Sequence, residues 1–160
     1  MPVARNPLKH QPIASKRERM AMVQLLIQEE PKMAFSDLEI IRGGKSYAVD
    51  TVEQLQAAQP GQYWFIVGAD ALKDISQWKQ PERLLLHCRI AAAVRPPVEK
   101  AQVLARVPEA LRDKVDLIDL APMDTASFDL RDRLARNKPV APMLPDRVLD
   151  YIRENKLYRS

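Results

Sequence analysis

The segment that determines how the rest of the chain is interpreted is Tyr63-Trp64-Phe65-Ile66-Val67-Gly68-Ala69-Asp70. Its first five residues are apolar at every position, which is typical of a strand covered on both faces of a sheet. Gly68 then allows a tight turn, and a new helix can begin near Asp70. We therefore expect a central parallel strand whose carboxyl end leads into a loop that could hold a ligand.

Strands and helices alternate after this stretch. Apolar runs at residues 90–94 and 115–120 predict two more strands, and the first of them stops at Pro96-Pro97. Helices are predicted from Pro81 over residues 84–86 and over residues 99–112 with a break at Pro108. Two short helices follow, around residues 130–134 and 148–152. This order predicts an α/β protein with a Rossmann-like, doubly wound, mostly parallel sheet and C-terminal helices.

The residues before Tyr63 carry their own start and stop signals. Ser15 and Glu18 have the spacing of a capping box, so a helix should follow and end near residues 29–30, before Pro31. Residues 36–40 alternate like a half-buried strand, and Gly43-Gly44 supplies a turn. A further helix should be capped by Asp50 or Thr51.

Length and composition indicate one globular domain over residues 1–160, with a helical C-terminal part from about 121 to 160. Hydrophobic residues make up 46% of the chain and charged residues 29%, and the net charge is +4. No nucleic-acid motif or membrane span accompanies that charge, so we predict that the chain binds neither nucleic acid nor a membrane. The sequence leaves open whether it forms a homo-oligomer. Cys88 is the single cysteine, which excludes an intramolecular disulfide and fits a cytoplasmic protein.

Asp70 and Trp78, which both follow the first strand, could contact a nucleotide. Asp70 stands where a carboxylate can accept hydrogen bonds from ribose hydroxyls, although it could equally cap the following helix. Trp78 lies in a polar stretch between two helices, and its indole could stack on a flat heteroaromatic ring or simply pack across the loop. The residues alone leave both pairs of alternatives open.

Phosphate contacts are expected at two other places. Ser127 opens a helix and Arg131 lies four residues later on the same face, which suits phosphate oxygens; an N-cap and a surface charge are the alternative. Lys9, in Asn6-Pro7-Leu8-Lys9, could also hold a phosphate. Two histidines and one cysteine make no zinc-ligand set, and four glycines cannot form a dinucleotide-binding or Walker loop.

The order and spacing of these motifs resemble the nicotinate-nucleotide adenylyltransferases, members of the nucleotidyltransferase superfamily with a Rossmann-like fold. Besides the proline loop at Lys9, the similar segments are Ser46-Tyr47-Ala48-Val49-Asp50-Thr51, Phe65 to Leu72 with Gly68-Ala69-Asp70, Trp78, Val94-Arg95-Pro96, Ala126 to Arg131, and Leu144 to Tyr158.

The resemblance implies adenylyl transfer from ATP, with Mg²⁺, to nicotinate mononucleotide, which yields deamido-NAD and pyrophosphate. It places one group of residues on the nicotinate mononucleotide side: Tyr47, Asp50, Thr51, Trp78 and Arg95. It places a second group on the ATP and phosphate side: Lys9, Gly68, Asp70, Ser127 and Arg131. Two other readings stay open, namely a non-catalytic nucleotide-binding remnant or sensor and an adenylyltransferase for another phosphorylated substrate.

The chain also departs from the family pattern. The family's first strand, its Gly-Gly-x-Phe-Asp-Pro loop and its His-x-Gly-His motif do not precede Met1, so we expect an N-terminally incomplete fold with no catalytic residue identified. His10 belongs to a different loop and does not replace that motif. Ala48, Ala126 and Phe128 stand where the family has hydroxyl side chains, which removes polar contacts.

Overall fold

The computed structural model describes residues 1–8, 12–121, 126–141 and 143–159. The chain divides into two compact units. Unit 1 comprises Met1–Ser46 and Asp124–Ser160, and unit 2 comprises Tyr47–Met123. A single domain over residues 1–160 stays a prediction.

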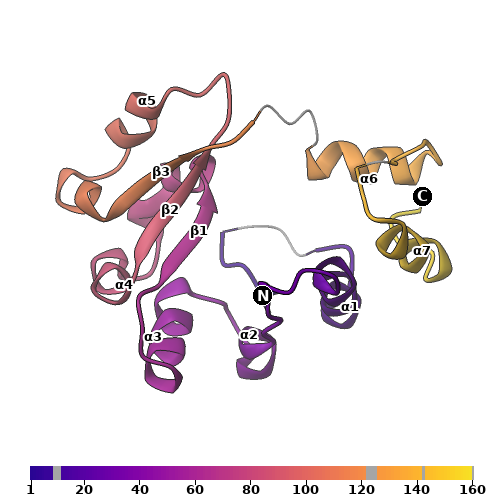
Figure 1. Ribbon diagram of the computed structural model, residues 1–160, viewed down its shortest axis with the longest axis horizontal. Helices are drawn as coiled ribbons and strands as arrows, with labels where there is room; N and C mark the ends of the chain where they lie inside the picture. The colour runs from indigo at the N-terminus through magenta and orange to yellow at the C-terminus, as the bar shows by residue number, and fades with distance from the viewer. Residues whose placement is uncertain (9–11, 122–125, 142, 160) are drawn as a thin grey trace. The chain divides into compact units, whose positions relative to one another are not determined.

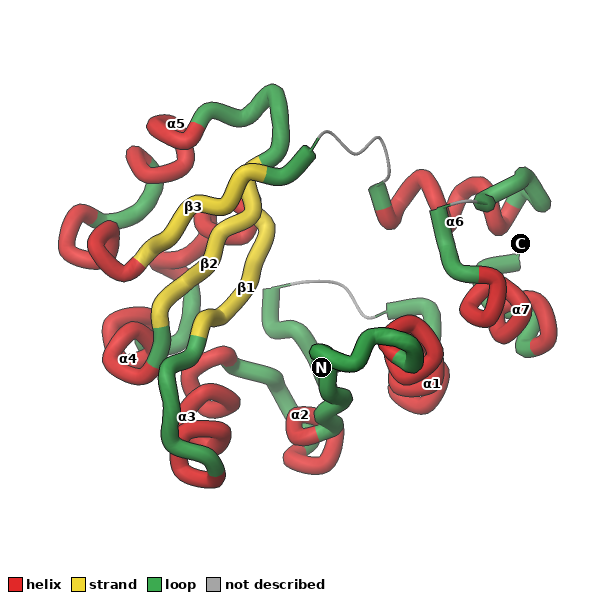
Figure 2. The backbone as a smooth tube through the Cα atoms, viewed as in Figure 1, coloured by secondary structure: helices red, strands yellow, loops and turns green. Residues whose placement is uncertain are grey.

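Unit 2 contains a parallel sheet of three strands, which lie side by side in Figure 1 and appear in yellow in Figure 2. They are β1 (Trp64–Gly68), β2 (Arg89–Val94) and β3 (Val115–Asp119), in the order β1-β2-β3. Gly68 is in register with Ala93, and Val94 is in register with Asp119. The carboxyl ends of the strands therefore meet at one edge of the sheet. The predicted Rossmann-like α/β class with a parallel sheet is confirmed.

Within the described part of unit 2, one helix precedes these strands and four connect them, two of which begin where proline predicted a start or a break. They are α3 (Ala48–Ala58), the 3-10 helix η1 (Ala69–Gln77), α4 (Pro81–His87), α5 (Lys100–Ala105) and the 3-10 helix η2 (Glu109–Lys114). Pro81 occupies the first turn of α4, and Pro108 is the N-cap of η2. The predicted cap of α3 was wrong: Tyr47 is the N-cap, because its carbonyl already accepts the Thr51 amide.

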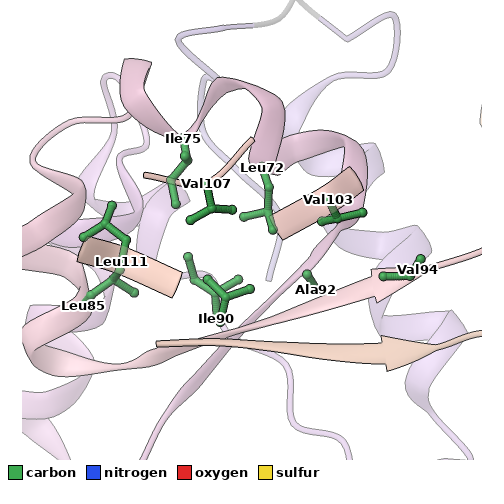
Figure 3. Packing of buried hydrophobic residues seen from close by; sticks show 10 residues of the cluster. Leu72, Ile75, Leu85, Ile90, Ala92, Val94, Val103, Val107 and Leu111 are labelled. Carbon is green, nitrogen blue, oxygen red and sulfur yellow. The ribbon is translucent and has the colours of Figure 1, made fainter. Parts of the chain in front are cut away.

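The main core lies on one face of the sheet. Leu72 and Ile75 of η1 and Val103 of α5 point toward Ile90 and Ala92 of β2, as Figure 3 shows. A second cluster joins Val49 and Val52 of α3 to Leu84 of α4. Each buried side chain of this size contributes about 1.5–3 kcal/mol relative to exposure. The crossover helices therefore hold the strand ends in place through apolar burial.

The prediction that the run at Tyr63–Val67 forms a central strand covered on both faces was wrong. Within the described residues β1 pairs on one side only, with β2, and β2 takes the central position. Side chains alternate across the sheet, so Trp64 and Ile66 lie on the face opposite the main core and are 48% and 74% exposed. An unbroken apolar run thus did not distinguish an edge strand from a central one.

Unit 1 is helical in its described part, with α1 (Lys16–Ile27), α2 (Leu38–Arg42), α6 (Ser127–Ala135) and α7 (Asp146–Glu154). The predicted capping box is confirmed, since the Glu18 amide donates to Ser15 Oγ at 3.3 Å and the Ser15 amide to Glu18 Oε2 at 2.6 Å. Helix α1 packs against α7, whose Val148, Leu149 and Ile152 are buried. None of the helices within the described ranges is long and apolar enough to cross a membrane.

The strand predicted at residues 36–40 was wrong, because α2 occupies this place. The Ile41 amide donates to the Asp37 carbonyl and the Gly43 amide to the Glu39 carbonyl, both at 3.0 Å. Glu39, which alternation would have turned to solvent, is buried. Five residues are too few for a two-residue period to be told from one helical turn. The predicted turn is confirmed: Gly43 and Gly44 have φ of 70° and 65°, which glycine adopts without steric cost.

Candidate functional site

Asp70 lies in the first turn of η1, directly after the carboxyl end of β1. Its carboxylate pairs with Lys73 Nζ at 2.5 Å and does not cap the helix. The hydrogen bond from Lys73 lowers the pKa of Asp70 from its ordinary value, and the charges of Arg95 and Arg106 add to this. The structure therefore brings an ionised carboxylate and three cationic side chains together at the end of the sheet where ligands bind in α/β folds.

Gly68 does not act as predicted. Its φ of −71° and ψ of 147° are open to any residue, so no tight turn requires glycine here. A Cβ built on Gly68 would meet nothing within 4 Å. The absence of a side chain leaves the end of β1 accessible, and a contact with a nucleotide remains a prediction.

Tyr47 and Asp50, at the start of α3, meet Lys79 in the segment between η1 and α4. Lys79 Nζ lies 2.8 Å from Asp50 Oδ1 and 2.9 Å from Oδ2. The same ammonium lies 4.8 Å from the centroid of the Tyr47 ring, within the range of a cation–π contact. We call these three residues, together with Trp78, the α3 cluster. Within this cluster, Asp50 and Lys79 are in contact although they are 29 positions apart in the sequence.

Trp78 ends η1 and is partly buried. It packs against both hydrophobic clusters of unit 2, and its ring meets Phe65 edge to face with centroids 6.0 Å apart. The structure thus supports the packing alternative considered for this residue. Because the side chain is only partly buried, this packing does not exclude a ligand that stacks on its exposed part, and the nicotinate contact remains a prediction.

Thr51 supports the start of α3. It is fully buried, and its hydroxyl donates to the Tyr47 carbonyl at 3.2 Å. The N-cap Tyr47 makes no side-chain capping hydrogen bond to the first turn of α3. Its first amide groups therefore keep the partial positive charge of a helix N-terminus beside Tyr47.

Ser127 and Arg131 belong to unit 1. Ser127 is the first residue of α6, after the N-cap Ala126, and its hydroxyl does not cap the helix. Arg131 is exposed, and its charge lowers the pKa of Tyr158, although burial is the larger effect and leaves that pKa raised. Lys9, which the sequence also singled out for a phosphate contact, lies outside the described residues.

Sequence reasoning missed three cationic residues, Lys73, Lys79 and Arg106. The position of Lys73 three residues after Asp70 in a helix was a usable signal for their ion pair. Lys79 was adjacent to Trp78, but its partner Asp50 lies on another helix. Arg106 carried no signal, because only the return of α5 to the sheet brings its charge near Asp70.

The described residues contain no group of three His, Cys, Asp or Glu side chains arranged to hold a metal ion. Asp70 and Asp50 are each engaged by a lysine. The described residues of this chain therefore do not fit a metal site built from protein ligands alone.

A parallel sheet with charged residues gathered where its strands end defines a Rossmann-like α/β protein of the nucleotide-binding type. Residues 1–139 match the Cytidylyltransferase-like family. A probable nicotinate-nucleotide adenylyltransferase from Synechococcus sp. (strain JA-3-3Ab) is 37% identical over 154 residues, which cover 93% of this chain and 74% of that protein. One from Bordetella petrii is 35% identical over 98% of this chain and 80% of its own length. The chain belongs to the nicotinate-nucleotide adenylyltransferase family.

Solved structures agree with this fold. The Plasmodium falciparum nicotinic acid mononucleotide adenylyltransferase complexed with NaAD matches with a TM-score of 0.69 at 20% identity, over 92% of this chain and 76% of that chain. At that identity the match concerns the fold alone. Together with the relatives it confirms the resemblance identified from the motifs.

Proposed function

We propose that this chain transfers the adenylyl group of ATP to nicotinate mononucleotide and so produces deamido-NAD and pyrophosphate. The observation that carries the proposal is the α3 cluster, in which Tyr47, Asp50 and Trp78, expected on the nicotinate side, meet in one unit with Lys79. The relatives of the chain carry the same activity in their names.

The reaction requires no nucleophile from the protein. A 5′-phosphate oxygen of nicotinate mononucleotide attacks the α-phosphorus of ATP, the bond from that phosphorus to the bridging oxygen breaks, and pyrophosphate leaves with the electron pair. Catalysis of such a transfer rests on positioning the reactants and on neutralising charge. Cationic side chains and helix N-termini supply both.

Unit 2 offers contacts for the two nucleosides. The rings of Tyr47 and Trp78 would flank the pyridine, and the N-terminus of α3, which Tyr47 does not cap with its side chain, would face the pyridine carboxylate. The carboxylate of Asp70 would accept hydrogen bonds from ribose hydroxyls, since its lowered pKa keeps it ionised. Arg95, whose charge reaches Asp70, would hold the phosphate of nicotinate mononucleotide, and Gly68 would let the ATP sugar approach the backbone.

The ATP phosphates would be bound by Ser127 and Arg131 at the start of α6, with Lys9 as a further cation. Mg²⁺ would arrive coordinated by the ATP phosphates, which suits an ion that is usually bound by few carboxylates, and would neutralise their charge. A cytoplasmic location is part of the proposal. Cys88 is a free buried thiol, and burial raises its pKa to about 11, which fits a structural role in a reducing compartment.

The first test is pyrophosphate release by the purified chain with ATP, Mg²⁺ and nicotinate mononucleotide. Replacing Trp78 by Ala should raise the KM for nicotinate mononucleotide about tenfold or more, because stacking of an aromatic ring on a base contributes about 1–3 kcal/mol. The KM for ATP should change little.

Trp64→Ala is the matched control, since Trp64 lies at the amino end of β1, away from the strand ends where Asp70 lies. Circular dichroism should establish that both variants are folded, because Trp78 also packs against the core. A folded wild-type chain without pyrophosphate release would refute the activity. Equal effects of the two substitutions would refute the role of Trp78.

A further inference from the structure

Lys79 is held by two contacts that leave part of its hydrogen-bonding capacity unused. Its ammonium has three N–H donors, and the structure engages it with the two oxygens of one carboxylate, that of Asp50, at 2.8 and 2.9 Å. The centroid of the Tyr47 ring lies 4.8 Å from Nζ, and this cation–π contact is not a conventional hydrogen bond. The side chain of Lys79 is 40% exposed, so an incoming ligand can reach the ammonium.

The position of this ammonium is well defined for a lysine. A carboxylate on α3 and an aromatic ring at the start of the same helix restrict a flexible side chain that would otherwise sample many rotamers. Lys79 is also bonded in the chain to Trp78, the residue proposed to stack on the pyridine. A fixed positive charge therefore lies in the α3 cluster, close in the chain to the expected ring site.

A fixed ammonium distinguishes an acid from its amide. A carboxylate on the pyridine would accept a charge-assisted hydrogen bond from the remaining donor, and such bonds are roughly twice as strong as neutral ones. A carboxamide would accept only a weaker bond from the same donor. Asp50 keeps the ammonium in place in either case.

We propose that Lys79 determines the preference of this chain for the acidic pyridine nucleotide over its amide, by donating from its Asp50-bound ammonium to the pyridine carboxylate. This inference rests on the proposed function and adds a specificity residue to the same site. Lys79 recognises the charge, Tyr47 and Asp50 position Lys79, and Trp78 provides the surface for the ring.

Binding measurements test the inference without requiring turnover. In a Trp64→Phe background Trp78 is the only tryptophan, so quenching of its fluorescence should report ligands at the α3 cluster. Nicotinate mononucleotide and nicotinamide mononucleotide are titrated into this background and into its Lys79→Met, Lys79→Arg and Lys114→Met derivatives. Lys114 is an exposed lysine at the end of η2, directly before β3, and serves as the matched control.

The expected result is a loss of selectivity. Lys79→Met should weaken binding of the acid about tenfold and change binding of the amide by less than about twofold, as expected for a charge-assisted bond. Lys79→Arg should restore part of the preference, and Lys114→Met should retain all of it. An equal loss for both ligands, or no loss for either, would overturn the inference and leave Lys79 with only a structural contact to α3. A parent chain that binds neither ligand would instead refute the proposed function.

Discussion

Gly68 is surrounded by open space at the carboxyl end of β1. Its φ is negative, and no heavy atom beyond those of Gly68 and its two chain neighbours lies within 4 Å of the position of a Cβ. A methyl group can therefore be added there without a clash in the ligand-free chain. This makes Gly68 suitable for separating an effect on folding from an effect on binding.

Gly68→Ala should leave the free energy of unfolding unchanged or raise it by up to about 1 kcal/mol, because alanine reduces the conformational freedom of the unfolded chain. The KM for ATP should rise severalfold, since the methyl group would occupy space proposed for the nucleotide. Urea unfolding and steady-state kinetics measure the two quantities. An unchanged KM for ATP would show that the nucleotide does not approach the backbone at Gly68.

A polar network ties the three strands together near their amino ends. Arg89 of β2 donates to both oxygens of Asp116 of β3 at 2.8 and 2.7 Å, and Trp64 Nε1 of β1 donates to Asp116 at 2.8 Å. The hydrogen bonds from Arg89 and then from Trp64 hold the pKa of Asp116 at about 2, below its ordinary value of 3.8. The three side chains share the face of the sheet opposite the main core.

Arg89→Met should raise the pKa of Asp116 toward its ordinary value, which NMR titration of the carboxyl group can follow. Because the folded pKa is the lower one, the stabilisation is complete above about pH 4 and is lost as the pH falls toward about 2. The variant should therefore show a weaker dependence of stability on pH over that interval. At neutral pH the loss of stability should be small, since both side chains are partly exposed and solvent screens the ion pair. An unchanged titration midpoint would contradict the assigned cause.

The two compact units differ in how their stability can be observed. Both tryptophans, Trp64 and Trp78, belong to unit 2, so tryptophan fluorescence reports on the unfolding of that unit. The main core of unit 2 is built around fully buried side chains, among them Leu72 on η1 and Ile90 on β2. Fluorescence therefore measures the core that positions the strand ends and Asp70.

Leu72→Ala should lower the free energy of unfolding of unit 2 by about 2–5 kcal/mol, through lost burial and a cavity in the core. Leu86→Ala removes the same atoms from a leucine that is 82% exposed on α4, and its effect should stay within about 0.5 kcal/mol. Urea unfolding followed by tryptophan fluorescence compares the two. Similar losses in both variants would contradict the packing assigned to Leu72.

Local chemistry made a large part of the chain predictable from its residues. The capping box at Ser15, the helix start at Pro81, the break at Pro108 and the turn at Gly43 all follow from hydrogen bonds or torsion angles within a few residues. The apolar runs at β1, β2 and β3 identified the strands, and their alternation with helices indicated a parallel sheet. The Gly68-Ala69-Asp70 motif is also a pattern of neighbouring residues, so it could identify the family without the tertiary structure.

Contacts between distant residues depended on the tertiary structure. The apolar run at β1 could not reveal that β2 takes the centre of the sheet, because strand order is set by pairing across the fold. The ion pair between Asp50 and Lys79 and the effect of Arg106 on Asp70 arise where separate segments of the chain meet. Burial and electrostatic interactions depend on position in space, and the crossover helices determine that position only when they pack against the sheet.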